Sequence, residues 1–233
     1  MTNDKEIQNV SIEYLFTKDE KPLFKYKINL DEKTNLVSNE SDELPPDWTL
    51  LQNHKCPHCP LDEATTKYCP IAKNIFYLVE DFKNEFSYES TNVIVNTQER
   101  SYSKDTSMQI GLQSLLGVVM ATSGCPKLNF LKPMARFHLP FSSFEETMVR
   151  SISMYLLRQY FAHQNNIKPD YELEGLEKAY DEVNLVNKSL FQRTRSISKK
   201  DANLNAILIL DTFTVLLNSE LERNLESISS FFE

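Results

Sequence analysis

Every cysteine in this 233-residue chain is followed directly by proline, and no other feature constrains the fold as much. The four cysteines are Cys56, Cys59, Cys69 and Cys125. With only 10 prolines in the chain, four Cys-Pro pairs are not expected by chance. Because proline fixes φ and has no N–H, each pair sets the local backbone and helps to present the amides of the following residues to the sulfur. The pattern indicates a shared role for the four thiols.

The spacing of the cysteines favours a metal centre. Cys56 and Cys59 form a C-x-x-C pair, which places two thiolates on one side of a tight turn, as tetrahedral zinc or an iron–sulfur cluster requires. Cys69 follows ten positions later, and Cys125 lies far along the chain, so a shared ion would clamp the loop onto later elements. We predict zinc at these four residues, with an iron–sulfur cluster as the alternative.

Neighbouring side chains suit such a centre. His54 and His58 lie in the same loop and are reserve ligands if one cysteine does not bind. Thiolates on a divalent ion carry excess negative charge, which nearby cations would offset. Three lysines lie within two residues of a cysteine, namely Lys55, Lys67 and Lys127.

Two other interpretations of the cysteines stay open. Free cysteines are common in the cores of intracellular proteins and can be inert. The C-x-x-C pair could also be a redox dithiol, although that motif normally opens a helix after a strand and prolines surround it here. Disulfides are not expected in a chain that is not exported.

The N-terminal part of the chain predicts antiparallel strands. Residues 10–16 and 23–30 alternate between apolar and polar side chains, with a turn-rich stretch between them, and residues 35–38 predict a short third strand. Residues 39–50 contain two prolines and the only tryptophan, so we expect a loop that Trp48 packs down.

Most of the remaining chain has apolar residues at helical spacing. We expect one helix that begins at Pro70 and a second that begins near residues 105–107 and ends at Gly124. A third should follow the capping boxes at residues 142–146, and two more should lie within 170–196 and within 201–229, the last with Asp201 as N-cap. Residues 91–97 predict a further strand. The fold class is therefore α+β, with N-terminal antiparallel strands followed by a mainly helical, bundle-like body. We expect a small β element at 1–50 and the cysteine loop with its helical domain at 51–233, in one compact unit.

The segment 106–144 contains no Asp or Glu, which is unusual in a chain whose net charge is −8. Such a segment is typical of a buried core stretch or of a pocket for an anion. If the backbone is extended, Arg136 and His138 point the same way, so we predict an anion site at Lys127, Lys132, Arg136 and His138. The commoner arrangement is an ion-paired Arg136 and a hydrogen-bonded core His138.

Charge and hydropathy exclude several classes of partner. A net charge of −8 argues against binding to nucleic acid or to an anionic membrane. Residues 1–10 are polar and lack the apolar region of a signal peptide. The longest apolar run, Leu115–Ala121, is far shorter than a bilayer span. We expect a cytoplasmic protein without a nucleic-acid or membrane partner.

Several stretches resemble an uncharacterised bacterial protein family. They are His54–Leu61 (HKCPHCPL), Cys69–Ala72 (CPIA), Met120–Pro126 (MATSGCP) and Pro133–Phe141 (PMARFHLPF). The similarity extends over most of the chain. The resemblance implies a bacterial cytoplasmic protein, and it supplies no activity and no catalytic residue.

Three functional hypotheses follow. The first is a metal-stabilised binding or regulatory protein, in which zinc is held by the four cysteines and the basic segment contacts a small anion or an acidic partner. The second is an iron–sulfur redox protein or enzyme that uses the same ligands. The third is a metal-free enzyme with Arg136, His138 and Glu99 in a pocket, where the histidine acts as acid or base. No motif pairs a nucleophile with that histidine.

Overall fold

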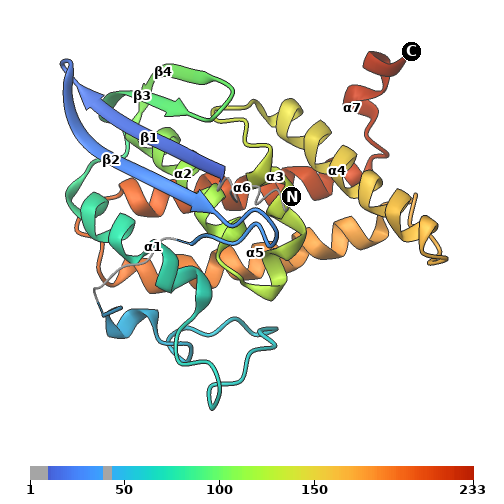
Figure 1. Cartoon of the computed structure of the whole chain (residues 1–233), viewed down its shortest axis with the longest axis horizontal. Helices are drawn as coiled ribbons and strands as arrows, with labels where there is room; N and C mark the ends of the chain where they lie inside the picture. The colour runs from blue at the N-terminus through green and yellow to red at the C-terminus, as the bar shows by residue number, and fades with distance from the viewer. Residues whose placement is uncertain (1–9, 39–43) are drawn as a thin grey trace, which may run out of the picture.

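One antiparallel sheet and a set of packed helices make up the fold (Figure 1). The computed structural model describes residues 10–38 and 44–233. The strands run in the order β2-β1-β3-β4. They are β1 (Val10–Lys18), β2 (Lys21–Leu30), β3 (Ser90–Asn96) and β4 (Ser101–Ser107). The sheet thus combines the N-terminal hairpin with a second hairpin from beyond residue 50.

Alternation explains why these strands form and which face they bury. In β1, Tyr14 and Phe16 are fully buried, and the residues between them are half-buried. Their pairing partners across β2 and β3 include Tyr26 and Val95, which are also buried. One face of the sheet therefore packs against the helices, as period-2 alternation predicts.

The fourth strand was missed by sequence reasoning. The helix expected to start near residues 105–107 begins at Met108 with Ser107 as its N-cap residue, and the residues before it, Ser101–Ser107, pair with β3 along the whole strand. This strand has almost no apolar side chains, since it lies at the edge of the sheet, where polar and charged residues are tolerated and discourage further pairing. The short strand expected at residues 35–38 is reduced to one bridge between Leu30 and Val37.

The helices follow the apolar periodicity closely. They are α1 (Pro70–Asp81), α2 (Met108–Thr122), α3 (Lys132–Arg136), α4 (Phe144–Gln164), α5 (Glu174–Arg195), α6 (Ala202–Glu222) and α7 (Glu226–Ser229). Short 3-10 helices occur at η1 (Asp47–Thr49), η2 (Phe82–Asn84), η3 (Pro126–Leu131) and η4 (Ser230–Phe232). The α+β class with strands early and helices late is confirmed.

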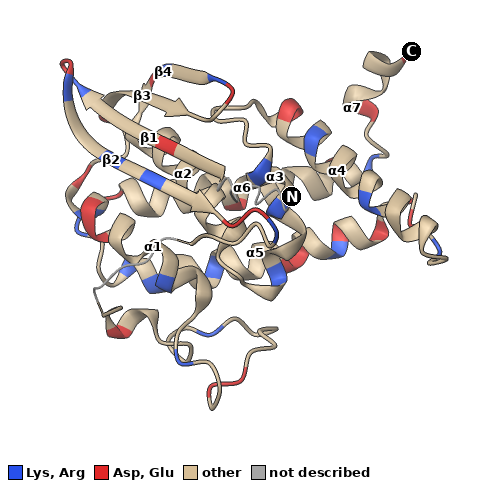
Figure 2. Cartoon of the chain, viewed as in Figure 1, with Lys and Arg blue, Asp and Glu red and all other residues tan. Residues whose placement is uncertain are grey.

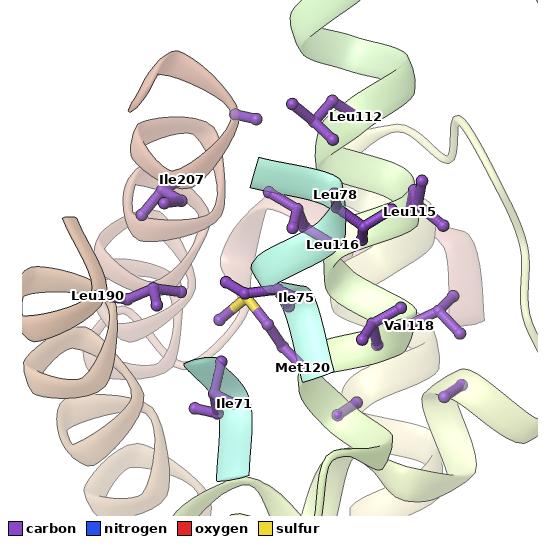
Figure 3. Packing of buried hydrophobic residues seen from close by; sticks show 14 of the residues in the cluster. Ile71, Ile75, Leu78, Leu112, Leu115, Leu116, Val118, Met120, Leu190 and Ile207 are labelled. Carbon is purple, nitrogen blue, oxygen red and sulfur yellow. The ribbon is translucent and has the colours of Figure 1, made fainter. Parts of the chain in front are cut away.

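Helix α2 lies at the centre of the core. It carries no charged residue, as its uniform colour in Figure 2 shows, and it is apolar around most of its circumference. A helix of this kind is stable only when other elements cover it on several sides. Figure 3 shows Ile75 of α1 beside Leu116 of α2, with Leu190 of α5 and Ile207 of α6 completing the cluster.

The helix termini confirm the N-cap positions predicted for α4 and α6, although only the first has the side-chain hydrogen bonds of a cap. Ser143 forms a capping box with Glu146, since the Ser143 hydroxyl accepts from the Glu146 amide and the carboxylate accepts from the Ser143 amide. Asp201 does not cap α6 with its side chain. Its carboxylate instead accepts from the amide and hydroxyl of Ser87, which ties α6 to the segment before β3.

The loop predicted before the cysteines is confirmed where the structure describes it. Trp48 lies in η1 and is only 8% exposed, so it packs the loop down as expected. Residues 39–43 of that prediction lie outside the described residues.

Among the described helices, only α6 has the length and the apolar composition that a membrane-spanning helix needs. The bent pair formed by α2 with η3 and α3 passes the same test jointly. In the fold, α6 packs against α5 and α2, although only 22% of its apolar stretch is buried. Core helices of soluble proteins meet the same criteria, so the absence of a membrane partner stays a prediction.

Replacement by alanine should have opposite effects on stability at the two glycines of α2. A Cβ at Gly111 would lie 2.6 Å from the Phe16 ring and 2.8 Å from Val93, whereas a Cβ at Gly117 would meet only Leu210, at 3.8 Å. We expect Gly111→Ala to lower the free energy of unfolding by about 1–2 kcal/mol, because overpacking outweighs the gain in helix propensity. Gly117→Ala should raise it by about 0.5–1 kcal/mol.

Urea unfolding of both variants measures these changes. A neutral Gly111→Ala would contradict the close packing of α2 on the sheet, and a destabilised Gly117→Ala would contradict the space between α2 and Leu210 of α6.

Candidate functional site

The cysteine loop joins η1 to α1 without a helix or strand of its own. It spans residues 50–69 and lies at the end of the molecule away from the sheet (Figure 1). Leu50 pairs with Tyr68 in an isolated bridge, and the Leu51 amide donates to the Lys67 carbonyl at 2.9 Å, so the two ends of the loop are held together. Within the loop, the Cys59 amide donates to the Cys56 carbonyl at 3.0 Å, which closes the C-x-x-C turn.

The Cys-Pro pairs at the other two cysteines begin helices. Cys69 is the N-cap residue of α1 and Cys125 is the N-cap residue of η3, each with proline in the first helical position. Their backbones are nearly identical, with φ −62° and ψ 123° at Cys69 and φ −63° and ψ 122° at Cys125. Proline is favoured in the first turn because its missing N–H would have no helical partner there. The Cys-Pro pattern thus has a local structural cause at two sites.

The charges of other cysteines act on two of the thiols, Cys56 in the loop and Cys125 at the start of η3. The Cys56 thiol lies close enough to Cys69 and Cys59 for their charges to act on it, and the Cys125 thiol is affected in the same way by Cys69 and Cys56. Burial is the largest cause of the shifts. It raises the pKa of the Cys56 thiol, and it raises the pKa of Cys125 to about 11. All four thiols are free, and Cys125 is the most deeply buried.

Hydrogen-bond donors surround these sulfur atoms. The backbone amides of Lys127 and Leu128 lower the pKa of the Cys125 thiol in part, and the Leu128 amide also donates to the Cys125 carbonyl at 3.0 Å. Ser189 of α5 interacts in the same way with the Cys56 sulfur. Donors aimed at sulfur stabilise its negatively charged form, which is the form that binds a metal.

A buried arginine holds the loop against α5. Arg193 is 2% exposed. Its Nη1 donates to the carbonyls of Trp48 at 3.0 Å and Leu50 at 2.7 Å, and its Nη2 donates to the carbonyl of Leu51 at 3.0 Å. Arg193 thus satisfies the carbonyls of Trp48 and Leu51, and it adds a second donor to the Leu50 carbonyl, which also accepts from the Asn53 amide at 3.1 Å.

The charge of Arg193 has no carboxylate partner among the described residues. No Asp or Glu there lies within ion-pair distance of its guanidinium. Burial lowers the pKa of Arg193, and the charges of Cys69, Cys56 and Cys59 oppose this shift. Cys69, Cys56 and Cys59 would supply negative charge near this buried cation if their thiols were ionised. Sequence reasoning missed Arg193, since nothing in the local sequence of α5 marks it.

The thiols do not stand in a finished coordination geometry. Within residues 10–38 and 44–233, no three side chains of His, Cys, Asp and Glu are placed so that they could hold a metal ion as they stand. His58, expected as a reserve ligand, lies beside Lys127 and Glu182. Burial is the main cause that lowers the pKa of His58, and the charges of Lys127 and Glu182 have smaller effects. Neither ring nitrogen has a hydrogen bond of normal geometry.

The four residues predicted to bind an anion have separate surroundings. Lys127 is ion-paired with Glu182 of α5 at 2.5 Å. Residues 132–136 are helical rather than extended, so the parity that would align Arg136 with His138 does not apply. Pro133 in the first turn and the apolar residues after it suit a short helix.

Arg136 and His138 also differ in their partners. Arg136 forms no ion pair within the described part of the chain, and its buried Nη1 has no hydrogen-bond partner there, so the ion-paired arrangement is not found. His138 Nε2 is hydrogen-bonded to the Tyr14 hydroxyl at 2.5 Å. Burial, followed by the charge of Arg150, lowers the pKa of His138 to about 3, so the ring is neutral.

Comparison with curated proteins and with solved structures found no match. A family model described as "Domain of unknown function (DUF6901)" matches residues 12–233, from the first strand to the last residue. The match includes the cysteine loop, Cys125 and Arg193 in one unit. The chain therefore belongs to this family.

Proposed function

We propose that the four cysteines bind one zinc ion, and that this ion stabilises a cytoplasmic binding or regulatory protein. An iron–sulfur cluster on the same residues is the alternative. In this proposal, the metal has a structural role and joins the loop at residues 50–69 to the start of η3 at Cys125. A reducing cytoplasm would keep the thiols available for the metal. The bacterial origin implied by the sequence motifs belongs to the same proposal.

The observation that carries the proposal is the buried charge of Arg193 beside the thiols. A buried cation is expensive unless an anion or good hydrogen bonds compensate it, and three carbonyls provide only dipoles. Four thiolates on Zn²⁺ have a net charge of −2, which a neighbouring guanidinium would offset. Neutral thiols would give Arg193 no counter-charge, so its position is better explained by ionised sulfur.

The weak packing of the loop also supports a metal. Of the loop side chains between residues 51 and 68, only Leu51 is buried. A structureless loop of this length is uncommon in a compact domain unless it is functional or is held by a cross-link. A metal bound by loop and body would supply that cross-link, and its binding energy would add to the stability of the fold.

Metal binding would change the thiols in two ways. Burial favours the protonated form of Cys56 and Cys125, so zinc would have to displace these protons. The side chains would also have to move together, because no group is preformed. Hydrogen bonds to sulfur and a nearby cation are equally suited to a cluster, which is why the iron–sulfur alternative stays in the proposal.

The first prediction concerns metal content. Protein purified without oxygen should contain about one zinc per chain, and Cys125→Ser should lose most of the metal and unfold at a lower temperature. His58→Ala is the matched control in the same loop and should keep its zinc, because the His58 ring lies beside Lys127 and Glu182. Elemental analysis and thermal unfolding measure both effects.

Three outcomes separate the alternatives. A brown protein that contains iron and loses it in Cys125→Ser would favour the cluster. Loss of zinc in His58→Ala would indicate a mixed ligand set. Metal-free protein that also fails to bind added Zn²⁺ or Co²⁺ would refute the metal centre altogether.

The second prediction concerns Arg193. Arg193→Met should lower the free energy of unfolding by about 3–5 kcal/mol, since three buried carbonyls lose charged donors. Arg193→Lys keeps the positive charge but cannot donate to all three carbonyls in the same geometry. The lysine variant should therefore bind zinc more tightly than the methionine variant. Arg195→Met, at an exposed position on the same helix, is the control and should change neither quantity. Chemical unfolding and competition with a zinc chelator measure the two effects. Equal zinc affinity in the lysine and methionine variants would show that the charge of Arg193 does not act on the metal.

A further inference from the structure

A second site is a cavity of about 160 Å³ that α2 lines in part. Its walls come from α2, from the segment between η3 and the start of α4, and from the facing sides of α5 and α6. Apolar side chains form most of the lining, among them Val118 of α2, Val183 of α5, and Leu210 and Phe213 of α6. For scale, a cavity of about 150 Å³ in another protein interior accommodates a benzene molecule. The space here therefore suits a compact ring or a short branched chain.

The lining is unusual in its charge. Among the described residues that form it, none is Asp or Glu, and Arg150 is the one with a permanent charge. The acid-free segment 106–144 contributes most of these residues, so this segment lines a pocket. Of the four residues predicted to bind an anion, only His138 reaches the cavity, and it is neutral there. The positive charge comes from Arg150 of α4 instead.

Arg150 has unused donors. Its Nη2 donates to the carbonyls of Phe137 at 2.6 Å and Met134 at 3.2 Å, at the end of α3. In the described part of the chain, Nη1 and Nε form no hydrogen bond, and no carboxylate lies within ion-pair distance. The nearest acid along α4, Glu146, uses its carboxylate in the capping box with Ser143. A guanidinium that lines an apolar cavity and keeps free donors at Nη1 and Nε can give a charge-assisted hydrogen bond to a carboxylate oxygen.

Asn187 supplies an independent sign of a missing partner. It lines the same cavity, is 1% exposed, and has no hydrogen bond of normal geometry at either amide atom. Burial raises the pKa of the nearby Asp211 carboxyl, and the Asn187 amide offsets part of that rise, so the two side chains are close without pairing well. Buried amides are rarely left in this state, because the lost hydrogen bonds with water are not replaced.

A short hydrogen-bond chain fixes another part of the lining. Ser114 and His138 both line the cavity, and the fully buried Tyr14 hydroxyl connects them, at 2.8 Å from the Ser114 hydroxyl and 2.5 Å from His138 Nε2. Because Tyr14 belongs to β1 and Ser114 to α2, this wall is anchored to the sheet. The polar groups of the cavity are thus held in place before any ligand arrives.

We propose that this cavity binds a small organic carboxylate with a compact apolar body, such as an aromatic acid or a short branched-chain acid. Arg150 donates a charge-assisted hydrogen bond from Nη1 to a carboxylate oxygen, the apolar walls surround the body, and Asn187 hydrogen-bonds a polar atom of the ligand. A single guanidinium matches one carboxylate better than a phosphate dianion, which would need further donors. The inference does not rest on the metal centre, because no cysteine lines the cavity.

The test uses full-length protein and three probes of related shape. Benzoate has the ring and the charge, benzyl alcohol has the ring alone, and acetate has the charge alone. By titration calorimetry or ligand-observed NMR, benzoate should bind about tenfold or more tightly than either of the others, as expected for a charge-assisted hydrogen bond in a buried site. Isovalerate extends the test to a branched acid.

Variants locate the binding. Arg150→Met should abolish the preference for benzoate over benzyl alcohol, whereas Arg158→Met, at an exposed position on the same helix, should leave it unchanged. Gly117→Leu places a larger side chain against Leu210 across the cavity and should abolish binding of both rings while the fold is kept. It serves as the decisive variant if Arg150→Met fails to fold.

The proposal is overturned if neither benzoate nor isovalerate binds at millimolar concentration. It is also overturned if benzoate and benzyl alcohol bind equally well to the unmodified protein, or if benzoate binding survives Gly117→Leu. Absence of binding would show that the cavity does not bind these acids. Equal binding of benzoate and benzyl alcohol would show that charge is not recognised, and binding that survives Gly117→Leu would place the ligand elsewhere.

Discussion

The burial of α2 is the constraint on which the rest of the structure depends. A helix without a single charge must be covered, and here the sheet, α1 and α6 all contribute to that cover. At Gly111 the helix approaches the sheet so closely that no side chain fits between them. This position fixes the helix along its axis and thereby determines where its C-terminal end lies. Cys125 follows directly after that end, and the cavity is formed along the side of the same helix. Both candidate sites are consequences of how α2 is seated.

Two arginines with similar environments mark the two sites. Arg193 and Arg150 both donate to backbone carbonyls, both have a pKa lowered by burial, and neither has a carboxylate partner in the described part of the chain. Carbonyl dipoles orient a guanidinium well but cannot neutralise it. A fold with a net charge of −8 has many acids that could have paired with them. Retaining two such cations suggests that each leaves room for an anion of another kind, sulfur in one case and an external acid in the other.

Local features of the fold could be predicted from the sequence, whereas contacts between distant residues could not. Periodicity predicted the first hairpin and the long helices, because an amphipathic element carries its pattern in its own residues. It failed for β4, whose residues are polar since an edge strand buries little, and it did not indicate the short helix at residues 132–136. Proline in the first turn identified the helix start after Cys69, and the same argument applied to Cys125 would have located η3. The partner of the loop could not be identified in this way, because Arg193 reaches it only through the packing of α5.

Because Arg193 lies far from the loop in sequence, the ribosome synthesises the loop long before the side chain that binds it. The Trp48 carbonyl and its donor are 145 residues apart in the chain. At a synthesis rate of about 5–20 residues per second, the loop leaves the ribosome roughly 7–30 seconds before the side chain that fastens it. During that interval, three of the four thiols are exposed on an unfastened segment. The nascent chain is therefore most vulnerable to oxidants and to capture of the wrong metal before translation is complete, and this period ends only when α5 emerges.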